Sequence, residues 1–440
     1  MLKRKFYDSL LEWKSMHRKE CLLVKGARQI GKTYIIDYFA RNNYRSYLYV
    51  NFLQHSEYRK IFSASLEAAD IYKELSLRFP EFRLIPGETA IFLDEIQNCP
   101  RARAAFKSLA IDGRVDVIAS GSLLGLSFLN DGNQKERANE SIPVGYERQV
   151  TMHSLDFEEY LWANGYDENA IGVLHECYDE LKPVPKAGNE KMERLFREYM
   201  VNGGMPEVVN AFLDAQSFSE AYSVQEKITD SNLDDIARYA ANVDKPKIRA
   251  LYLSIPVHLA RENKKFKFSE IERGASNRKF GHCVDWLRES SLVHQCHNLT
   301  APVIPLRVYK STDIYKLYMS DVGMLSAMMG FATKKRIMDG SLTDFAKGGL
   351  YENAIMSLLV RRGYEPYYFL PRSNASEIDF LIEKDGAVVP IEVKASNDTS
   401  KSFNRFLERD DVRYGYKLVD GNIGKVGKKI TLPHYMAMFL

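Results

Sequence analysis

An eight-residue stretch near the N-terminus has the spacing of a phosphate-binding loop. Gly26-Ala27-Arg28-Gln29-Ile30-Gly31-Lys32-Thr33 follows the pattern G-x-x-x-x-G-K-[ST], between an apolar run at 21–24 and a segment of helical spacing that reaches Ala40. Such a loop turns its backbone N–H groups toward phosphate oxygens at the positive end of a helix dipole. We expect this stretch to bind ATP or GTP, with Lys32 on the β- and γ-phosphates and Thr33 on Mg²⁺. An ordinary glycine turn is the alternative.

Two acidic residues, Asp94 and Glu95, follow a second apolar run at 90–93. This is the form of a Walker B strand buried in a parallel sheet, in which Asp94 would hold Mg²⁺ through water and Glu95 would polarise the attacking water. A buried strand that simply ends in an acid is the alternative. A further predicted strand at 115–119 leads to Ser120 and Ser122. Ser120, or else Ser122, is expected to contact the γ-phosphate or the attacking water, although either could instead cap a helix.

A third set of polar residues lies in the C-terminal quarter of the chain. Asp379 and Glu392 fall on two predicted strands joined by a hairpin turn at 385–386, and Lys394 shares a strand face with Glu392. These two carboxylates, with a main-chain carbonyl, could bind Mg²⁺ or Mn²⁺ while Lys394 orients the water that attacks a phosphodiester. Glu352, in the first turn of a helix expected from 350, would add a ligand or a base. The alternatives are a salt-bridged sheet surface and a nuclease-like fold kept only for binding.

The order of predicted elements assigns these residues to an α/β protein with four domains. Residues 1–150 alternate strands and helices and predict a doubly wound parallel sheet of the P-loop NTPase type. Residues 151–240 read as helices. Within 241–325, helices at 247–260, 268–275 and 280–289 precede strands at 292–296 and 307–309, which is the order of a winged helix. Residues 326–440 predict an α/β, nuclease-like domain.

Several motifs are specific enough to suggest a family. Besides the loop at 26–33, they lie at 91–97, 119–125, 152–161, 203–207 and 317–325. With these motifs the chain resembles the AAA-type ATPases of bacteria and archaea that carry a C-terminal domain of unknown function. The resemblance implies an ATP-hydrolysing enzyme, and winged-helix modules occur in the same family. The arrangement of Glu352, Asp379, Glu392 and Lys394 likewise resembles the PD-(D/E)xK nuclease fold. Many family members have arginine where this chain has Tyr146, and Arg148 is then the nearest alternative for an arginine finger.

The charge and cysteine content of the chain limit which binding partners and cell compartments are expected. The 440 residues carry a net charge of only +3, so any polyanion-binding surface must be local. Residues 245–288 hold eleven Lys or Arg against four Asp or Glu, which favours DNA, although a solvated face or a protein partner would fit as well. Five cysteines without a C-x-x-C pair predict reduced thiols and a cytoplasmic protein. No signal peptide or membrane span is expected, and a homo-oligomer is possible.

These observations leave two hypotheses. In the first, an ATPase acts on DNA through the winged helix and the nuclease-like part. In the second, a nucleotide-dependent switch binds a protein partner, and the nuclease-like part is a catalytically inactive scaffold.

Overall fold

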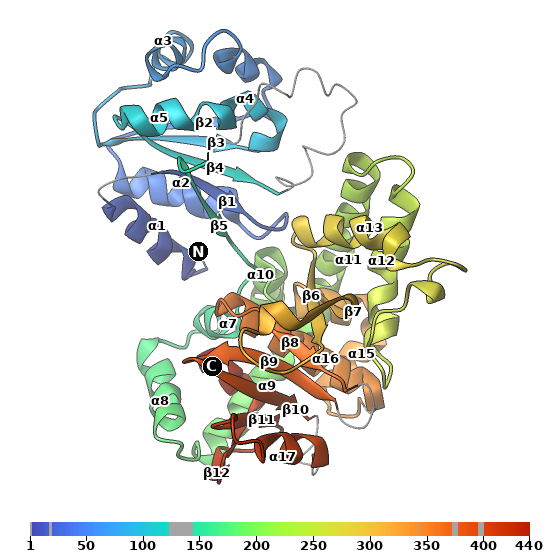
Figure 1. Ribbon diagram of the computed structural model, residues 1–440. Coiled ribbons are helices and arrows are strands. Elements are labelled where there is room, and N and C mark those ends of the chain that lie inside the picture. The colour runs from blue at the N-terminus through green and yellow to red at the C-terminus, as the bar shows by residue number, and fades with distance from the viewer. Residues whose placement is uncertain (1, 17–19, 123–143, 343, 372–376, 395–399) are drawn as a thin grey trace. The chain divides into compact units, whose positions relative to one another are not determined.

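The computed structural model describes residues 2–16, 20–122, 144–342, 344–371, 377–394 and 400–440 (Figure 1). The chain forms two compact units. The N-terminal unit comprises Arg4–His153 with Glu289–Ser291, and the C-terminal unit comprises Ser154–Arg288 and Leu292–Leu440 with the first residues of the chain. The predicted boundaries at 240/241 and 325/326 both fall inside the C-terminal unit, and smaller domains within it stay a prediction.

The N-terminal unit is built on a parallel five-stranded sheet in the order β2-β3-β4-β1-β5. Helices cover both faces, since one buried cluster joins side chains of β1 and β2 to those of α3 and α5, while the apolar residues of α2 lie outside that cluster. The predicted α/β class is confirmed. The strands are β1 (Cys21–Lys25), β2 (Ser46–Asn51), β3 (Thr89–Asp94), β4 (Asp116–Gly121) and β5 (Glu147–Thr151), and the helices are α1 (Phe6–Ser15), α2 (Lys32–Asn43), α3 (Ala68–Arg78), α4 (Pro100–Ala104) and α5 (Phe106–Asp112).

Strand β5 was not predicted, because its sequence, Glu-Arg-Gln-Val-Thr, lacks the apolar run that marked the other strands. It lies at the edge of the sheet beside β1, and its side chains are partly or fully exposed. An edge strand needs no apolar residues on a solvated face. One polar side chain is nonetheless anchored: Glu147 forms a two-pronged ion pair with Arg103 of α4, at 2.6 and 2.8 Å.

The C-terminal unit begins with the expected helical region. Asp156 starts α7 with a capping box, in which its carboxylate accepts from the Glu159 N–H and the Glu159 side chain accepts from the Asp156 N–H. The helices are α7 (Phe157–Ala163), α8 (Glu168–Asp179), α9 (Lys186–Asn202), α10 (Pro206–Ala215) and α11 (Phe218–Tyr239).

The segment predicted as a winged helix contains two full helices and one short turn. Helix α12 (Lys245–Leu259) retains Pro256 near its end, and α13 (Asn277–Glu289) follows. The middle helix expected at 268–275 is only a 3₁₀ turn, Phe268–Glu270, and the chain then reverses through Gly274 at φ +80°. The hairpin consists of β6 (Val293–Leu299) and β7 (Lys310–Met319). Residues 307–309, expected to form the second strand, lie in a 3₁₀ turn that follows Pro305, and the strand starts at Lys310.

That hairpin belongs to the same sheet as the C-terminal strands. The order of this eight-stranded mixed sheet is β12-β13-β11-β10-β9-β8-β6-β7, in which Asn298 of β6 pairs with Tyr368 of β8. Two short helices, α14 (Val322–Met328) and α15 (Phe331–Met338), lead to α16 (Asp344–Arg361), and α17 (Lys401–Leu407) lies between strands. The remaining strands are β8 (Tyr367–Phe369), β9 (Ile378–Lys384), β10 (Ala387–Val393), β11 (Gly415–Val419), β12 (Gly424–Val426) and β13 (Lys429–Pro433).

Helix α16 starts six residues earlier than expected, which places Glu352 in its middle and not in its first turn. The sequence suggested a later start because Gly348 and Gly349 are poor helix formers. The structure gives a reason for Gly349 inside the helix: a Cβ there would lie 2.1 Å from the main-chain oxygen of Leu259 in α12. The glycine therefore permits the close approach of α16 to α12.

Three of the family-specific motifs meet inside the C-terminal unit. The Asp321 carboxylate accepts hydrogen bonds from Ser154 Oγ at 2.7 Å, the Gly204 N–H at 2.8 Å and the Gly323 N–H at 2.9 Å. A Cβ on Gly204 would lie 1.9 Å from the Leu155 carbonyl oxygen. These motifs thus join segments that are distant in sequence. The contacts of Asp321 and Gly204 show a packing role for these motifs.

Candidate functional site

The predicted phosphate-binding loop connects β1 to α2 in the N-terminal unit. Gly26 has φ +145°, and a Cβ there would lie 2.3 Å from the Met152 carbonyl oxygen, so only glycine fits. Gly31, at φ +89°, is the residue from which α2 begins. Arg4, which lies just before α1, holds the loop by hydrogen bonds. Its Nη1 donates to the Ile30 carbonyl at 3.0 Å, and its Nη2 donates to the His153 carbonyl at 2.5 Å.

Lys32 is a buried cation whose hydrogen bonds go to main-chain oxygens. Its Nζ donates to the carbonyls of Gly26 at 2.8 Å and Ala27 at 2.6 Å, and within the described residues it forms no ion pair. Burial lowers the pKa of Lys32 to about 8, although Glu95 and Asp94 act in the opposite direction. An ammonium held this way is stabilised by an added anion, and a phosphate chain is the anion for which this loop geometry is suited.

Asp94, at the end of β3, is the centre of the polar contacts beside the loop. Its Oδ2 accepts from Thr33 Oγ1 at 3.0 Å and from Tyr49 Oη at 2.8 Å, and Asn51 Nδ2 lies at 3.3 Å. Two neighbouring oxygen ligands of an octahedral Mg²⁺ lie ~3 Å apart, so the Thr33–Asp94 spacing fits a shared magnesium ion. Thr33 and Asp94 would hold it, and Mg²⁺ would supply charge neutralisation to bound phosphates.

Ser120 contacts the Walker B acid directly. Strand β4 lies between β1 and β3, and Ser120 Oγ donates a hydrogen bond to Asp94 Oδ1. Glu95 adopts a left-handed conformation, φ +55°, and accepts a hydrogen bond from Gln97 Nε2 at 2.5 Å. The fold therefore brings together the phosphate-binding loop with its Thr33, the Walker B residue Asp94, and Ser120. The catalytic roles of Glu95 and Ser120 stay predictions. Residues 123–125 of the motif after Ser120, and Pro143, lie outside the described residues.

A second polar cluster occupies the C-terminal unit, around Glu352 of α16. Lys316 of β7 lies 3.3 Å from Glu352 and 2.5 Å from Glu377, and Lys264 lies 2.9 Å from Glu352. Tyr318 Oη also donates to Glu352, at 2.9 Å. Burial opposes charge on Glu352, but Lys316 and Lys264 outweigh it and lower its pKa to about 2. Burial likewise opposes charge on Lys316, yet Glu352 and its neighbours raise its pKa well above the usual range.

The hairpin that carries Asp379 and Glu392 forms as expected, from antiparallel β9 and β10. Lys394 Nζ pairs with Glu392 Oε1 at 2.8 Å, and Ser400 Oγ donates to the same oxygen at 2.6 Å. Asp379 Oδ2 accepts from the Val393 N–H at 2.8 Å. Burial, followed by the charges of Glu392 and Glu352, raises the pKa of Asp379 well above its usual range. The surroundings of Asp379 therefore disfavour its charged form.

The fit of this cluster to a divalent metal is partial. Glu392 Oε2 is buried without a hydrogen-bond partner, which leaves one oxygen for a cation. Ligand atoms of Glu352, Asp379 and Glu392 do not, however, come together within 4.8 Å; among the described residues only Asp244, His282 and Cys283 form a group of that kind. The metal-binding and nuclease roles of Glu352, Asp379, Glu392 and Lys394 stay predictions.

Several residues of the two clusters were not predicted. Tyr49 and Asn51 lie on β2, and a polar residue at the carboxyl end of this apolar strand was the available signal for Asn51. Lys264 and Lys316 belong to the segment interpreted as a winged helix. No local pattern links them to Glu352, because the contact depends on the packing of β7 against α16. Arg148, the alternative arginine finger, contacts Met16 Sδ at 3.0 Å from the edge strand β5.

The parallel sheet and the loop at 26–33 have the architecture of a P-loop nucleotide-binding domain. Residues 18–161 match the family model described as the AAA domain, which supports an AAA-type P-loop ATPase domain in this part of the chain. Residues 193–335 and 347–431 match two models described as domains of unknown function, DUF8612 and DUF4143 respectively. The predicted resemblance to AAA-type ATPases is thereby confirmed for the N-terminal part, and the C-terminal match is consistent with it. No curated protein matches the chain.

Solved structures with a similar fold include a Walker-type ATPase of Pyrococcus abyssi, with 15% identity over 75% of this chain and 96% of that chain, and a TM-score of 0.44. The ORC1 protein of Aeropyrum pernix in complex with DNA shares 14% identity over 76% of this chain and 92% of that chain, with a TM-score of 0.27. DnaA from Aquifex aeolicus bound to AMPPCP shares 13% identity over 65% of this chain and 86% of that chain, with a TM-score of 0.28.

In the described part of the chain, no helix has both the length and the apolar character needed to cross a bilayer.

Proposed function

We propose that the chain binds and hydrolyses ATP with Mg²⁺ in its AAA domain and uses the nucleotide state to control engagement of DNA by the C-terminal unit. The observation that carries the first part is the buried Lys32, which forms no ion pair with any described residue, beside the Thr33–Asp94 contact. The loop N–H groups and Lys32 bind the phosphates, Thr33 and Asp94 hold Mg²⁺, and Glu95 orients the attacking water. Ser120 positions Asp94 and contacts the γ-phosphate or that water.

The DNA part is supported by charge that the fold leaves uncompensated. Five of the eleven basic residues in 245–288 form ion pairs with described residues: Lys247, Arg261, Lys264, Lys267 and Arg288. Exposed cations that form no ion pair with any described residue are Arg249, Arg273, Arg278 and Lys279. Arg278 and Lys279 lie in the first turn of α13. Exposed, unpaired Arg and Lys side chains are suited to contacts with the phosphates of a duplex.

The second candidate is a nucleotide-dependent switch that binds a protein partner, with the nuclease-like part as an inactive scaffold. One observation favours it. The carboxylates of the cluster already have cationic partners, since Glu352 and Glu377 pair with Lys264 and Lys316, and Glu392 pairs with Lys394. Burial raises the pKa of Asp379 and so disfavours the charged form that a cation would need. Cleavage would require an ionised Asp379 and a cation at Glu392 Oε2.

ATPase assays with Lys32→Ala and Glu95→Gln test the nucleotide part. We expect Lys32→Ala to abolish binding and Glu95→Gln to bind ATP without turning it over; unimpaired turnover in either variant would overturn the assignment. Exposed Lys60→Ala is the matched control.

DNA engagement is tested separately, by the salt dependence of binding to labelled duplex and single-stranded DNA. The double variant Arg278→Glu/Lys279→Glu should weaken binding and flatten the salt slope by about two charges. Lys191→Glu/Lys227→Glu, with the same charge change on exposed helices elsewhere, should not. Equal binding by both variants would favour a protein partner, which co-purification without DNA would support.

Cleavage is the third test. The protein is incubated with plasmid or single-stranded DNA and Mg²⁺ or Mn²⁺, beside Asp379→Ala. Cleavage products that form with the wild type and not with Asp379→Ala would establish nuclease activity. If neither protein forms products, or if both form them equally, the nuclease-like part is an inactive scaffold.

A further inference from the structure

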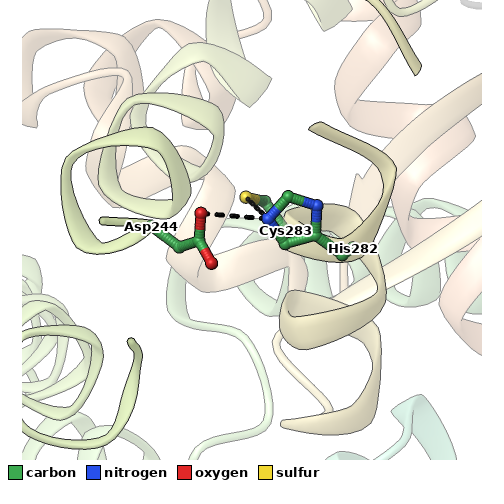
Figure 2. Close-up of side chains that lie close together, drawn as sticks. All are labelled: Asp244, His282 and Cys283. Carbon is green, nitrogen blue, oxygen red and sulfur yellow. Dashed lines mark hydrogen bonds and ion pairs between the residues drawn. The ribbon is translucent and has the colours of Figure 1, made fainter. Parts of the chain in front are cut away.

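Three potential metal ligands converge between α12 and α13, outside both clusters described above. Asp244 is the residue from which α12 begins, and His282 and Cys283 are consecutive in α13. His282 Nε2 lies 3.0 Å from Asp244 Oδ1 and 3.3 Å from Cys283 Sγ, and all three ligand atoms lie within 4.8 Å of one another. In Figure 2, the dashed lines from the Asp244 carboxylate and from the Cys283 sulfur end on the same ring nitrogen of His282.

This arrangement differs from a nucleophilic Cys–His–Asp triad. In a triad, the imidazole takes the proton of the thiol on one ring nitrogen and donates to the carboxylate from the other. Here both partners approach Nε2, so one atom would have to perform both tasks. Burial, followed by the charge of Asp244, also raises the pKa of the Cys283 thiol to about 12, which disfavours a free thiolate nucleophile.

The distances match the edges of a tetrahedral site. With Zn–N and Zn–O bonds near 2.05 Å and a Zn–S bond near 2.3 Å, tetrahedral geometry places N and O ~3.3 Å apart and S and N ~3.6 Å apart. The observed 3.0 and 3.3 Å therefore need to open by only about 0.3 Å each. A set of one sulfur, one nitrogen and one oxygen is typical of Zn²⁺, whereas Mg²⁺ and Ca²⁺ prefer oxygen alone.

The surroundings show what binding must overcome. Lys247 Nζ lies 3.2 Å from Asp244 Oδ1 and would face a second cation there. Lys247 has an alternative partner in the face of the Phe280 ring, whose centroid lies 5.5 Å from Nζ. Asp244 is largely buried, Cys283 is fully buried, and the His282 side chain is 53% exposed, which gives an ion access to the nitrogen.

We propose that Asp244 Oδ1, His282 Nε2 and Cys283 Sγ form a binding site for Zn²⁺, with water as the fourth ligand. The Cys283 S–H bond breaks, a Zn–S bond forms and the proton passes to solvent, with no change of oxidation state. The ion would tie the start of α12 to α13. This inference is independent of the ATPase and DNA proposals.

Cobalt spectroscopy on the full chain tests the site. Metal-free protein without nucleotide is titrated with Co²⁺, which substitutes for Zn²⁺ and shows a sulfur-to-cobalt charge-transfer band only when a thiolate is bound. We expect a band that saturates at one Co²⁺ per chain, disappears on addition of Zn²⁺ and is lost in Cys283→Ala. Cys177→Ala, which removes the partly exposed cysteine, should retain it. Ions bound by oxygen at the Walker or nuclease-like residues would not produce this band.

His282→Ala guards against a folding artefact, because its side chain is largely exposed. It should weaken Co²⁺ binding by at least about tenfold while its thermal unfolding without metal stays close to that of the wild type. Zn²⁺ should raise the melting temperature of the wild type more than that of His282→Ala. The proposal is overturned if the wild type shows no thiolate band at one equivalent, or if the band is unchanged in Cys283→Ala or His282→Ala.

Discussion

The phosphate-binding loop and the carboxylate–lysine cluster each hold a buried lysine near acidic residues, but the charge of that lysine is compensated differently in the two places. Lys32 donates to two carbonyls and has no ion pair among the described residues, and burial lowers its pKa to about 8. Lys316 lies between Glu352 and Glu377, and these carboxylates raise its pKa well above the usual range in spite of burial. Lys32 therefore has no anionic partner among the described residues, and a bound anion could supply one. Lys316 already has two carboxylate partners.

This difference separates a ligand site from a structural one. A buried charge that lacks a partner costs folding free energy, and a ligand that supplies the partner recovers it. A buried charge with two partners stabilises the fold and offers little to a ligand. The same substitution at the two lysines should therefore have opposite consequences for function and stability.

The largest expected effect is on nucleotide turnover in Lys32→Met. Methionine keeps the approximate shape but removes the charge that stabilises the phosphates, so ATP hydrolysis should fall by about a thousandfold. Stability of the nucleotide-free protein should not fall, because an uncompensated buried charge has been removed. Steady-state ATPase rates and thermal unfolding without nucleotide measure both, with Lys60→Met as an exposed control. A variant that hydrolyses ATP normally, or that unfolds far more easily, would contradict this account of Lys32.

The matched substitution Lys316→Met should act on stability. It leaves the buried Glu352 carboxylate with Lys264 as its single cation, and we expect a loss on the order of 3 kcal/mol in the free energy of unfolding of the C-terminal unit. Urea unfolding followed by tryptophan fluorescence, in a Trp13→Phe background that leaves Trp162 and Trp286, reports on that unit. ATP hydrolysis at low temperature should be retained. A stable Lys316→Met protein would show that the ion pairs contribute little.

The loop could be predicted from the sequence because all its parts are local. Eight consecutive residues determine the glycine conformations, the lysine and the threonine, and Asp94 comes from β3, which β4 alone separates from β1. The Asp379–Glu392 hairpin was likewise predictable, since a two-residue turn sets its register. These features depend on residues close in sequence or on one strand pairing.

What could not be predicted depends on contacts between distant segments. Lys264 and Lys316 reach Glu352 only because α16 packs against both α12 and β7, and the close approach at Gly349 is visible only in the folded chain. Strand β5 could not be predicted for a related reason. Its position in the sheet depends on pairing with β1, and an edge strand has only a weak pattern of apolar residues. The count of basic residues in 245–288 likewise could not show which of them are compensated, and Lys264 is one that pairs with a carboxylate of α16.

A smaller effect should appear in the pH dependence of nucleotide binding. Because burial lowers the pKa of Lys32 from 10.5 to about 8, the nucleotide-free protein gains stability as the pH rises through this window, while the cost of charging Lys32 is fully present below it. Bound phosphates favour the charged form, so binding should take up a proton in that window. The affinity should fall by up to about tenfold per pH unit above about pH 8.

Calorimetry of a non-hydrolysable ATP analogue with Mg²⁺, in two buffers of different ionisation enthalpy at about pH 9, counts these protons. Uptake should approach one per nucleotide in the wild type. Lys32→Arg, whose guanidinium stays charged, should show no such uptake. Equal uptake in both proteins would assign the proton to another group and remove the contrast with Lys316.

The smallest effect is expected at Asp379, and it decides how the cluster balances its charge. Since burial and the neighbouring carboxylates disfavour a charge on Asp379, Asp379→Asn should change the free energy of unfolding by less than about 1 kcal/mol, and the amide oxygen can still accept from the Val393 N–H. Glu352→Gln, which removes a charge held between two lysines, should cost several times more, because Lys316 and Lys264 lose their shared partner. Urea unfolding of both variants in the Trp13→Phe background gives the comparison. If Asp379→Asn is as damaging as Glu352→Gln, Asp379 is ionised in the folded protein, the cluster carries a net negative charge, and a divalent cation becomes the fitting partner for Glu392 Oε2.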